Sequence, residues 1–317
     1  MPKDEALNGM NRRHFLKWTI LTGGVPLVGL SQPHDASAGE ELNPDRWGVL
    51  VDVTLCIGCR TCEWACKKVN RLQCAPLETF GDTSAFTTMR RPDPVSYTVI
   101  NRYFHPGNPE QPIYVKVQCM HCDYPACASA CLVGALQKHP VTGAVIYDAW
   151  KCIGCRYCMV ACPFQIPAYE YFNALNPQVR KCTFCFERVT QKGDIPGCVK
   201  ICPQEVMIFG KRQELISAAR ERIAQHPDRY LHDIFGEHEV GGTSWMYIAP
   251  VPFQMIGFPT LGREPVTRLT ETVQHSLFKY FAAPITLYGF LGALMWLFRD
   301  RGNGSRSSIS GKGLDHV

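Results

Sequence analysis

The chain has little excess of charge of either sign and few long apolar runs, and these shortages exclude several classes of function. Its formal net charge of +5 over 317 residues is modest and lies largely in the two termini, so nothing indicates nucleic-acid binding. The sequence also lacks a G-x-G-x-x-G fingerprint, a helical HExxH motif and a serine, histidine and acid set. Nicotinamide binding and hydrolysis therefore have no support.

Cysteine, in contrast, is several times as frequent as in an ordinary enzyme of this size, with 17 residues. Disulfides are favoured in oxidising compartments, but they mostly serve chains too short to build a core. Here the thiols lie two and three residues apart, where the geometry for a disulfide between near neighbours is poor. The cysteines therefore indicate metal binding rather than a disulfide framework.

All but one of the cysteines fall into four groups with related spacings. The first and third groups read C-x2-C-x2-C-x3-C, the second reads C-x2-C-x4-C-x3-C, and the fourth reads C-x2-C-x12-C-x3-C. Four variations on one pattern are an internal repeat, which predicts a fold made by duplication of a small unit. The groups are Cys56, Cys59, Cys62, Cys66; Cys119, Cys122, Cys127, Cys131; Cys152, Cys155, Cys158, Cys162; and Cys182, Cys185, Cys198, Cys202.

The spacing C-x2-C-x2-C-x3-C-P, as in "CIGCRYCMVACP", is the run that ligates [4Fe-4S] cubes in bacterial ferredoxins, whereas structural zinc sites usually take two pairs separated by a loop. Three closely spaced thiolates curl around one cube, and the fourth reaches a second cube. We therefore expect four [4Fe-4S] clusters with nested, crossed ligands. The expected sets are Cys56, Cys59, Cys62 with Cys202; Cys182, Cys185, Cys198 with Cys66; Cys119, Cys122, Cys127 with Cys162; and Cys152, Cys155, Cys158 with Cys131.

Other residues near the groups have no predicted ligand role. Cys74 is left over after sixteen ligands are assigned and is predicted to be a structural or free thiol. His121 lies between two ligands, but its quartet is complete without it, so it is predicted to be a loop residue. Four cations near the groups are predicted to be solvated, with tuning of cluster potentials or docking of an acidic partner as the alternatives: Lys116, Lys151, Arg156 and Lys181.

The N-terminal residues 1–38 have the pattern of a twin-arginine export signal. Arg12 and Arg13 precede a weakly apolar run, and a small-x-small pattern predicts cleavage before Gly39. The alternative is an amphipathic helix at the start of the fold. This export route carries folded proteins, as a protein that acquires its cofactor in the cytoplasm requires.

Residues 277–299 are predicted to be a single transmembrane anchor. The stretch from Tyr280 to Phe298 contains no charge, and as a helix it would be about 28 Å long, close to the thickness of the hydrocarbon core. The alternative is a buried core helix. The basic tail at 300–317 is expected in the cytoplasm, which places the body on the periplasmic side of the inner membrane.

Between these ends the sequence predicts an α+β fold. Residues 45–210 are expected to form a duplicated bacterial-ferredoxin-like domain, two nested 2[4Fe-4S] units, with an insertion at 75–118 that is either a lid or partner contact or a plain surface hairpin. Residues 211–274 are expected to form a helix, ending at Pro227, and an extended connection to the C-terminal transmembrane helix.

With these motifs the chain resembles the four-cluster ferredoxin-like electron-transfer subunits of membrane-bound bacterial oxidoreductases, over Asp45 to about Arg222. The stretches "CRYCMVACP", "PGCVKICP", "IFGKRQEL" and "QHSLFKY" most resemble the HybA-type iron-sulfur subunit of periplasmic nickel-iron hydrogenases of the hydrogenase-2 type. The first two groups depart from the pattern by having Lys67 and Leu132 in place of the proline.

The resemblance implies a non-catalytic relay. Electrons from hydrogen oxidation at the hydrogenase large subunit would pass through the small subunit to these clusters, and then to a multispanning membrane partner that reduces quinone. Electrons could also flow through such a chain in the reverse direction. One alternative is the beta subunit of a molybdenum or tungsten enzyme, such as formate dehydrogenase or a polysulfide or dimethyl sulfoxide reductase. Those subunits often travel with a signal-bearing partner, so this chain's own Arg12 and Arg13 favour hydrogenase. Another alternative is a membrane-anchored metal-binding scaffold that has no redox function.

Overall fold

The computed structural model describes residues 43–268 and 287–296, and the chain divides into two compact units, residues 1–265 and 266–317. The predicted export signal at 1–38 and basic tail at 300–317 lie outside the described residues. Of the predicted anchor at 277–299, residues 287–296 are described and are helical. Within the described ranges, no helix is both long enough and apolar enough to cross a membrane.

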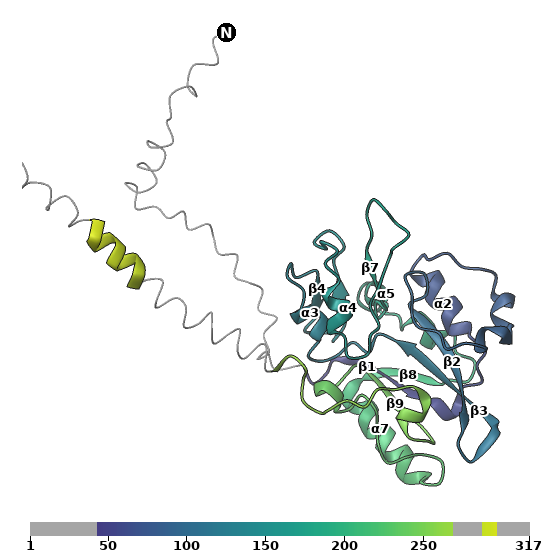
Figure 1. Cartoon of the computed structure of the whole chain (residues 1–317). Coiled ribbons are helices and arrows are strands. Elements are labelled where there is room, and N and C mark those ends of the chain that lie inside the picture. Colours follow the sequence, from purple (N-terminus) through teal and green to yellow (C-terminus); the bar gives the residue numbers. More distant parts are fainter. Residues whose placement is uncertain (1–42, 269–286, 297–317) are drawn as a thin grey trace, which may run out of the picture. The chain divides into compact units, whose positions relative to one another are not determined.

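A three-stranded sheet joins the two ends of the cysteine-rich segment (Figure 1). β1 (Trp47–Asp52) precedes the first cysteine, and β8 (Met207–Lys211), which follows the last ligand group, pairs with it in antiparallel fashion. β9 (Trp245–Ile248) pairs with the other edge of β1 in parallel fashion. All four residues of β9 are fully buried, so part of the predicted extended connection belongs to the core of this unit.

The two faces of this sheet are covered differently. On one face, α7 (Arg212–Gln225) packs through Leu215 and Ile216 against residues of β1 and β9. Each such aliphatic side chain stabilises the fold by about 1.5–3 kcal/mol when fully buried. On the opposite face, Trp245 and other sheet residues pack with Phe184 in the core that contains several cysteines. The helix therefore stabilises the sheet from the side away from the cysteines.

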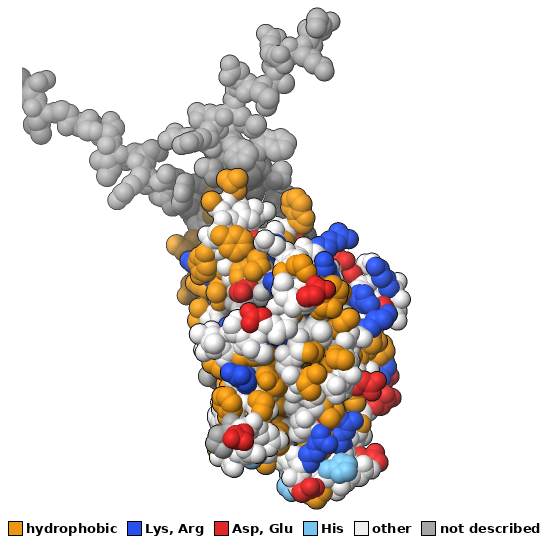
Figure 2. Space-filling model, turned by 90° about the vertical axis from the view of Figure 1, so that its right-hand side faces the viewer, with side chains coloured by type: hydrophobic (Ala, Val, Ile, Leu, Met, Phe, Trp, Pro, Cys, Tyr) orange, Lys and Arg blue, Asp and Glu red, His pale blue; other side chains and the backbone are white. Residues whose placement is uncertain are grey.

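The predicted insertion contains a long hairpin. β2 (Thr98–His105) and β3 (Asn108–Gln118) pair in antiparallel fashion, with an irregularity between Phe104 and His105. The 3-10 helices η2 (Leu77–Gly81) and η3 (Thr83–Phe86) precede it. The molecular face drawn in Figure 2, on the side of α2 and this hairpin, has apolar side chains dispersed among charged ones. The end of β3 enters the core, because Val115, Lys116 and Gln118 are all buried.

Short helices next to the cysteines form two packed pairs. α2 (Thr61–Val69) packs against α6 (Gly197–Lys200), and α3 (Ala126–Ser129) packs against α4 (Tyr157–Ala161). The outer groups thus meet each other, and so do the inner groups, as a nested duplication requires. The other elements are η1 (Val53–Leu55), β4 (Leu136–Lys138), β5 (Val145–Tyr147), β6 (Ala168–Tyr169), β7 (Val179–Arg180), α5 (Phe186–Lys192), η4 (Glu239–Gly241) and η5 (Phe253–Ile256).

The duplication is also visible in the backbone of matching loops. Gly58 and Gly154, at equivalent places in the first and third groups, have φ angles of 73° and 71°. The residues that precede α2 and α4, Arg60 and Arg156, are left-handed as well, with φ angles of 59° and 63°. Left-handed arginines are uncommon, so their recurrence at one position indicates that the two loops fold in the same way.

Candidate iron-sulfur cluster sites

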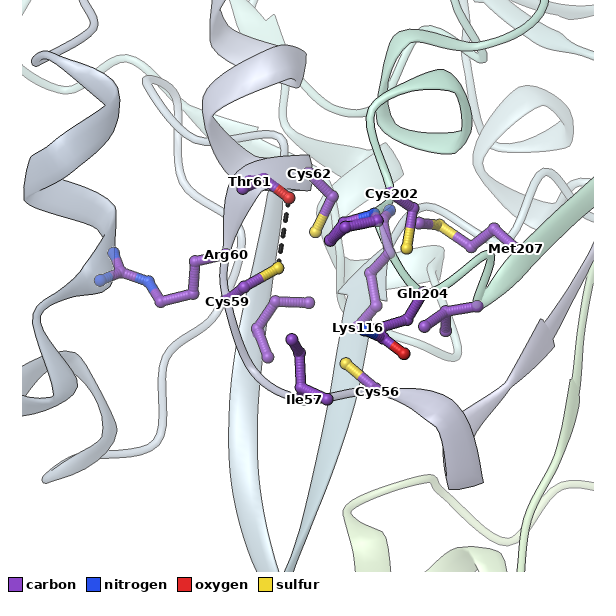
Figure 3. Close-up of a pocket in the computed structure, with 13 residues that line it drawn as sticks. Cys56, Ile57, Cys59, Arg60, Thr61, Cys62, Lys116, Cys202, Gln204 and Met207 are labelled. Carbon is purple, nitrogen blue, oxygen red and sulfur yellow. Dashed lines mark hydrogen bonds between the residues drawn. The ribbon is translucent and has the colours of Figure 1, made fainter.

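Four thiols from two distant parts of the chain surround one cavity. Cys56 follows η1, Cys59 lies just before α2, Cys62 lies in the first turn of α2, and Cys202 follows α6. They line one cavity, and Figure 3 shows them around the same space. We call this set quartet A. It combines three cysteines of the first group with the last of the fourth, as the crossed pairing requires, although ligation itself stays a prediction.

Three further quartets are identified by the thiols that influence one another's charge. Burial raises the pKa of the Cys66, Cys122 and Cys158 thiols, and neighbouring thiols raise each of these pKa values further. Because such electrostatic effects weaken with distance, the thiols concerned are near neighbours. Quartet B is Cys66, Cys182, Cys185, Cys198; quartet C is Cys119, Cys122, Cys127, Cys162; and quartet D is Cys131, Cys152, Cys155, Cys158.

The four quartets follow one another in a row. Burial is the main cause that raises the pKa of the Cys62 thiol in quartet A, and Cys198 of quartet B is one of the charged groups that raise it further. The pKa of Cys182 in quartet B is raised by burial and by Cys119 of quartet C. The pKa of Cys127 in quartet C is raised by burial and by Cys158 of quartet D. The packing agrees, because Cys62 and Cys198 belong to one buried cluster, Cys182 and Cys119 to a second, and Cys127 and Cys158 to a third. The order is therefore A, B, C, D.

The thiols in these quartets fit a cofactor that carries positive charge. A metal ligand must be a thiolate, but burial disfavours the negative form, which is why the thiol pKa values rise. Within the described ranges, no three His, Cys, Asp or Glu side chains converge closely enough to hold a single metal ion. Four sulfurs facing a common cavity, as in quartet A, match the donor set of an iron-sulfur cube instead.

Glycine and backbone amides shape the loops around the thiols. A Cβ at Gly58 would lie 2.5 Å from the ring of Tyr114, so the loop approaches β3 too closely for another residue. The Ala135 N–H donates to Cys131 Sγ over 3.1 Å, and the Phe184 N–H lies 3.4 Å from Cys182 Sγ. Such amide donors stabilise negative charge on sulfur and are one of the means by which a protein sets a cluster's potential.

Comparison with known proteins agrees with this geometry. A family model described as a 4Fe-4S dicluster domain matches residues 111–212. The hydrogenase-2 operon protein HybA of Escherichia coli O157:H7 is 35% identical in an alignment of 319 positions that covers 90% of this chain and 95% of HybA. The iron-sulfur subunit of nitrate-inducible formate dehydrogenase of Escherichia coli K12 is 32% identical, over 84% of this chain and 88% of that subunit.

The chain belongs to this HybA-like family of iron-sulfur subunits. A protein from Nitratidesulfovibrio vulgaris is 48% identical to it over 252 residues, which cover 78% of this chain and 66% of that protein. The resemblance to the HybA type is thus confirmed. Members of the family are electron-transfer subunits of oxidoreductase complexes and are not catalytic by themselves.

Two of the four cations near the quartets of this HybA-family subunit are buried, so the prediction that they are solvated is wrong. Lys116 is only 3% exposed and Lys181 only 5%. Lys181 Nζ donates to the carbonyl oxygens of Val145 and Cys182. The alternation of apolar and polar residues along a strand does not predict the burial of Lys116, because the end of β3 is surrounded by the core on both faces. The other two cations, Lys151 and Arg156, are exposed as predicted.

His121 lies in a loop, as predicted, and its side chain is fully buried. Its Nδ1 accepts a hydrogen bond from the Val145 N–H over 2.9 Å. Burial, together with the charges of Lys181 and Lys138, holds the His121 pKa well below its usual range, so the ring is neutral. The side chain therefore connects the quartet C loop to β5, and nothing about its contacts changes the prediction that it is not a ligand.

A buried ionic network beside quartet C was missed by sequence reasoning. Asp123 accepts two hydrogen bonds from Arg46, over 2.9 and 2.6 Å, and lies 3.3 Å from Lys138 and 3.8 Å from Arg212. Lys138 Nζ also donates to the Cys122 carbonyl oxygen over 2.8 Å. The network thus fixes the loop that carries Cys122, but its members are too far apart in the sequence to form a recognisable motif.

Quartet D lies at the surface end of the row. Cys155 is exposed, whereas Cys119, Cys127 and Cys162 of quartet C are buried. Many apolar side chains from the segments that carry quartet D and those next to it are exposed as well: Leu132, Trp150, Ile153, Val160, Tyr171, Phe172 and Leu175. Of the four quartets, quartet D is therefore the most accessible to another molecule.

Proposed function

We propose that this subunit is an electron relay that carries four [4Fe-4S] clusters, one in each quartet. The observation that carries the proposal is the row of four thiol quartets, which runs from quartet A through the buried interior to the exposed quartet D. When bound, each cluster takes up and releases one electron. The sixteen cysteines of the quartets hold the clusters, and the apolar core around them excludes water. Cys74 is not a ligand.

The two ends of the row are the proposed contacts with other subunits. At quartet D, exposed apolar and aromatic side chains lie next to an exposed thiol, which is the composition of the buried centre of many protein interfaces. At quartet A, Ile57 is 55% exposed beside the cavity. One end would receive electrons from a catalytic partner, and the other would pass them to a membrane partner.

The proposed catalytic partner is a periplasmic nickel-iron hydrogenase with its small and large subunits, and the proposed membrane partner is a multispanning quinone-reacting subunit. Support comes from the match to HybA along nearly the whole of both chains. The predicted export signal at 1–38 and anchor at 277–299 support a periplasmic position on the inner membrane, with the tail at 300–317 in the cytoplasm. Hydrogen oxidation would then be coupled to quinone reduction, in either direction.

The second candidate is a subunit of a molybdenum or tungsten enzyme, which the 32% identity to a formate dehydrogenase iron-sulfur subunit favours. The test is to purify the detergent-solubilised complex without oxygen and add hydrogen or formate. We expect hydrogen to bleach the cluster absorption and formate to leave it unchanged. Bleaching by formate alone would contradict the hydrogenase assignment and support the second candidate.

A further inference from the structure

Lys116 places a buried positive charge between quartets A and B. It is 3% exposed and lines the cavity of quartet A together with Cys56, Cys62 and Cys202 (Figure 3). Its ammonium group also lies over the ring of Trp245, which belongs to the same buried cluster as Cys62 of quartet A and Cys198 of quartet B. One ammonium group therefore lies close to two neighbouring quartets.

The position of this ammonium group is fixed by neutral neighbours. Lys116 Nζ donates to Gln118 Oε1 over 2.9 Å and lies 4.4 Å from the centre of the Trp245 ring. Gln118 Nε2 in turn donates to the Tyr247 hydroxyl over 2.6 Å, and that hydroxyl donates to the Lys116 carbonyl oxygen over 2.9 Å. The closed set of contacts joins β3 to β9 and restricts where the charge can lie.

No carboxylate neutralises this charge among the residues that the structure describes, since their ion pairs do not include Lys116. A buried charge without a partner is expensive. Lys138, a partly buried lysine near the quartets, shares Asp123 with two arginines. The anionic groups available to Lys116 are therefore the sulfurs of quartets A and B.

We propose that Lys116 sets the reduction potentials of the two clusters held by quartets A and B, by stabilising the extra electron on each. The inference rests on the proposed relay function. Uptake of one electron makes a cluster more negative, with no bond made or broken, and a fixed positive charge nearby favours that state. The charge therefore raises both potentials above the values that they would have without it, and it does so in a buried site that salt screens weakly.

The test is a redox titration with electron paramagnetic resonance detection on the full anaerobically purified complex. The variants are Lys116→Met and Lys116→Gln, which remove the charge, and Lys116→Arg, which keeps it. We expect two of the four potentials to fall in the neutral variants. The reduction equilibrium should change at least tenfold, which is 59 mV for a one-electron couple, at both low and high salt. Lys116→Arg should retain the original values.

The matched control is Lys151→Met, which removes an exposed lysine that lies next to Cys152 in the chain and is paired with Asp148. It should change the reduction equilibrium of each of the four clusters by less than twofold. Unchanged potentials in a neutral Lys116 variant that holds all its iron, or an equal shift of all four, would overturn the proposal. Loss of clusters in both neutral variants would make Lys116 structural and overturn it too.

The relay function fails on a different observation. If the unmodified subunit lacks four clusters, or if its clusters are not reduced by any donor, the proposed function is wrong whatever Lys116 does. If the unmodified subunit has four reducible clusters and Lys116→Met leaves their potentials in place, only the inference about Lys116 is wrong.

Discussion

Replacement of Gly58 by alanine should damage quartet A more than any other quartet. Gly58 has a φ angle of 73°, and an added Cβ would lie 2.5–2.8 Å from three ring carbons of Tyr114. The left-handed backbone costs about 1–2 kcal/mol with a side chain, and overpacking a rigid ring adds about 1–3 kcal/mol, so we expect a loss of about 2–5 kcal/mol. For a domain of this size the melting temperature should fall by roughly 4–20 °C.

The assay compares the melting temperature and the iron content of the anaerobically purified proteins. Gly154→Ala, at the equivalent loop of quartet D, should be milder, because its Cβ would meet the terminal hydroxyl of Tyr169 at 2.9 Å. Gly81→Ala is the control, since no atom lies within 4 Å of an added Cβ there. If Gly58→Ala has the same melting temperature as the Gly81→Ala control and keeps its iron, the loop does not need glycine and the reasoning is refuted.

Three further predictions concern the ionic network and the thiols. Asp123→Asn leaves Arg46, Lys138 and Arg212 without their buried partner and should cost about 3–5 kcal/mol in the free energy of unfolding, measured by chemical denaturation. Burial raises the Asp123 pKa, but the three cations outweigh it and hold the pKa below its ordinary 3.8, so the advantage of the unmodified protein should be complete above that pH and shrink as the pH falls below it. An advantage that persists unchanged at lower pH would contradict this account. Cys162→Ser should reduce the iron content from about sixteen to about twelve per chain and remove the same cluster signal as Cys122→Ser, not the one lost in Cys158→Ser. Cys74→Ser should leave the iron content unchanged, and loss of iron there would show that a ligand was misassigned.

The cysteine groups and most neighbouring secondary structure are predictable because local spacing determines them. The strand before Cys56, the strand after the turn at Pro140 to Gly143 and the helix that ends before Pro227 all follow from short-range patterns. The predicted hairpin in the insertion is present as β2 and β3. The crossed juxtaposition of thiols also follows from spacing, because a fourth cysteine at a helix boundary points away from the first three.

Long-range placement is what the sequence does not reveal. The segment of β9 has no period-2 alternation, because Trp245, Met246, Tyr247 and Ile248 are buried on both faces as a parallel partner of β1. Lys116 reads as a surface lysine until its strand is placed against β9 and the quartets. The Asp123 network likewise depends on residues separated by 77 positions in the chain, whose meeting only the fold decides.

The most direct test of the relay is the cluster content of the purified subunit, measured as iron, acid-labile sulfide and zinc per chain and followed by reduction with dithionite. The account predicts about sixteen iron and about sixteen sulfide per chain, with cube-type absorption that dithionite bleaches. Stoichiometric zinc in place of iron, or cluster absorption that dithionite leaves unchanged, would contradict it and favour a metal-binding scaffold without redox work.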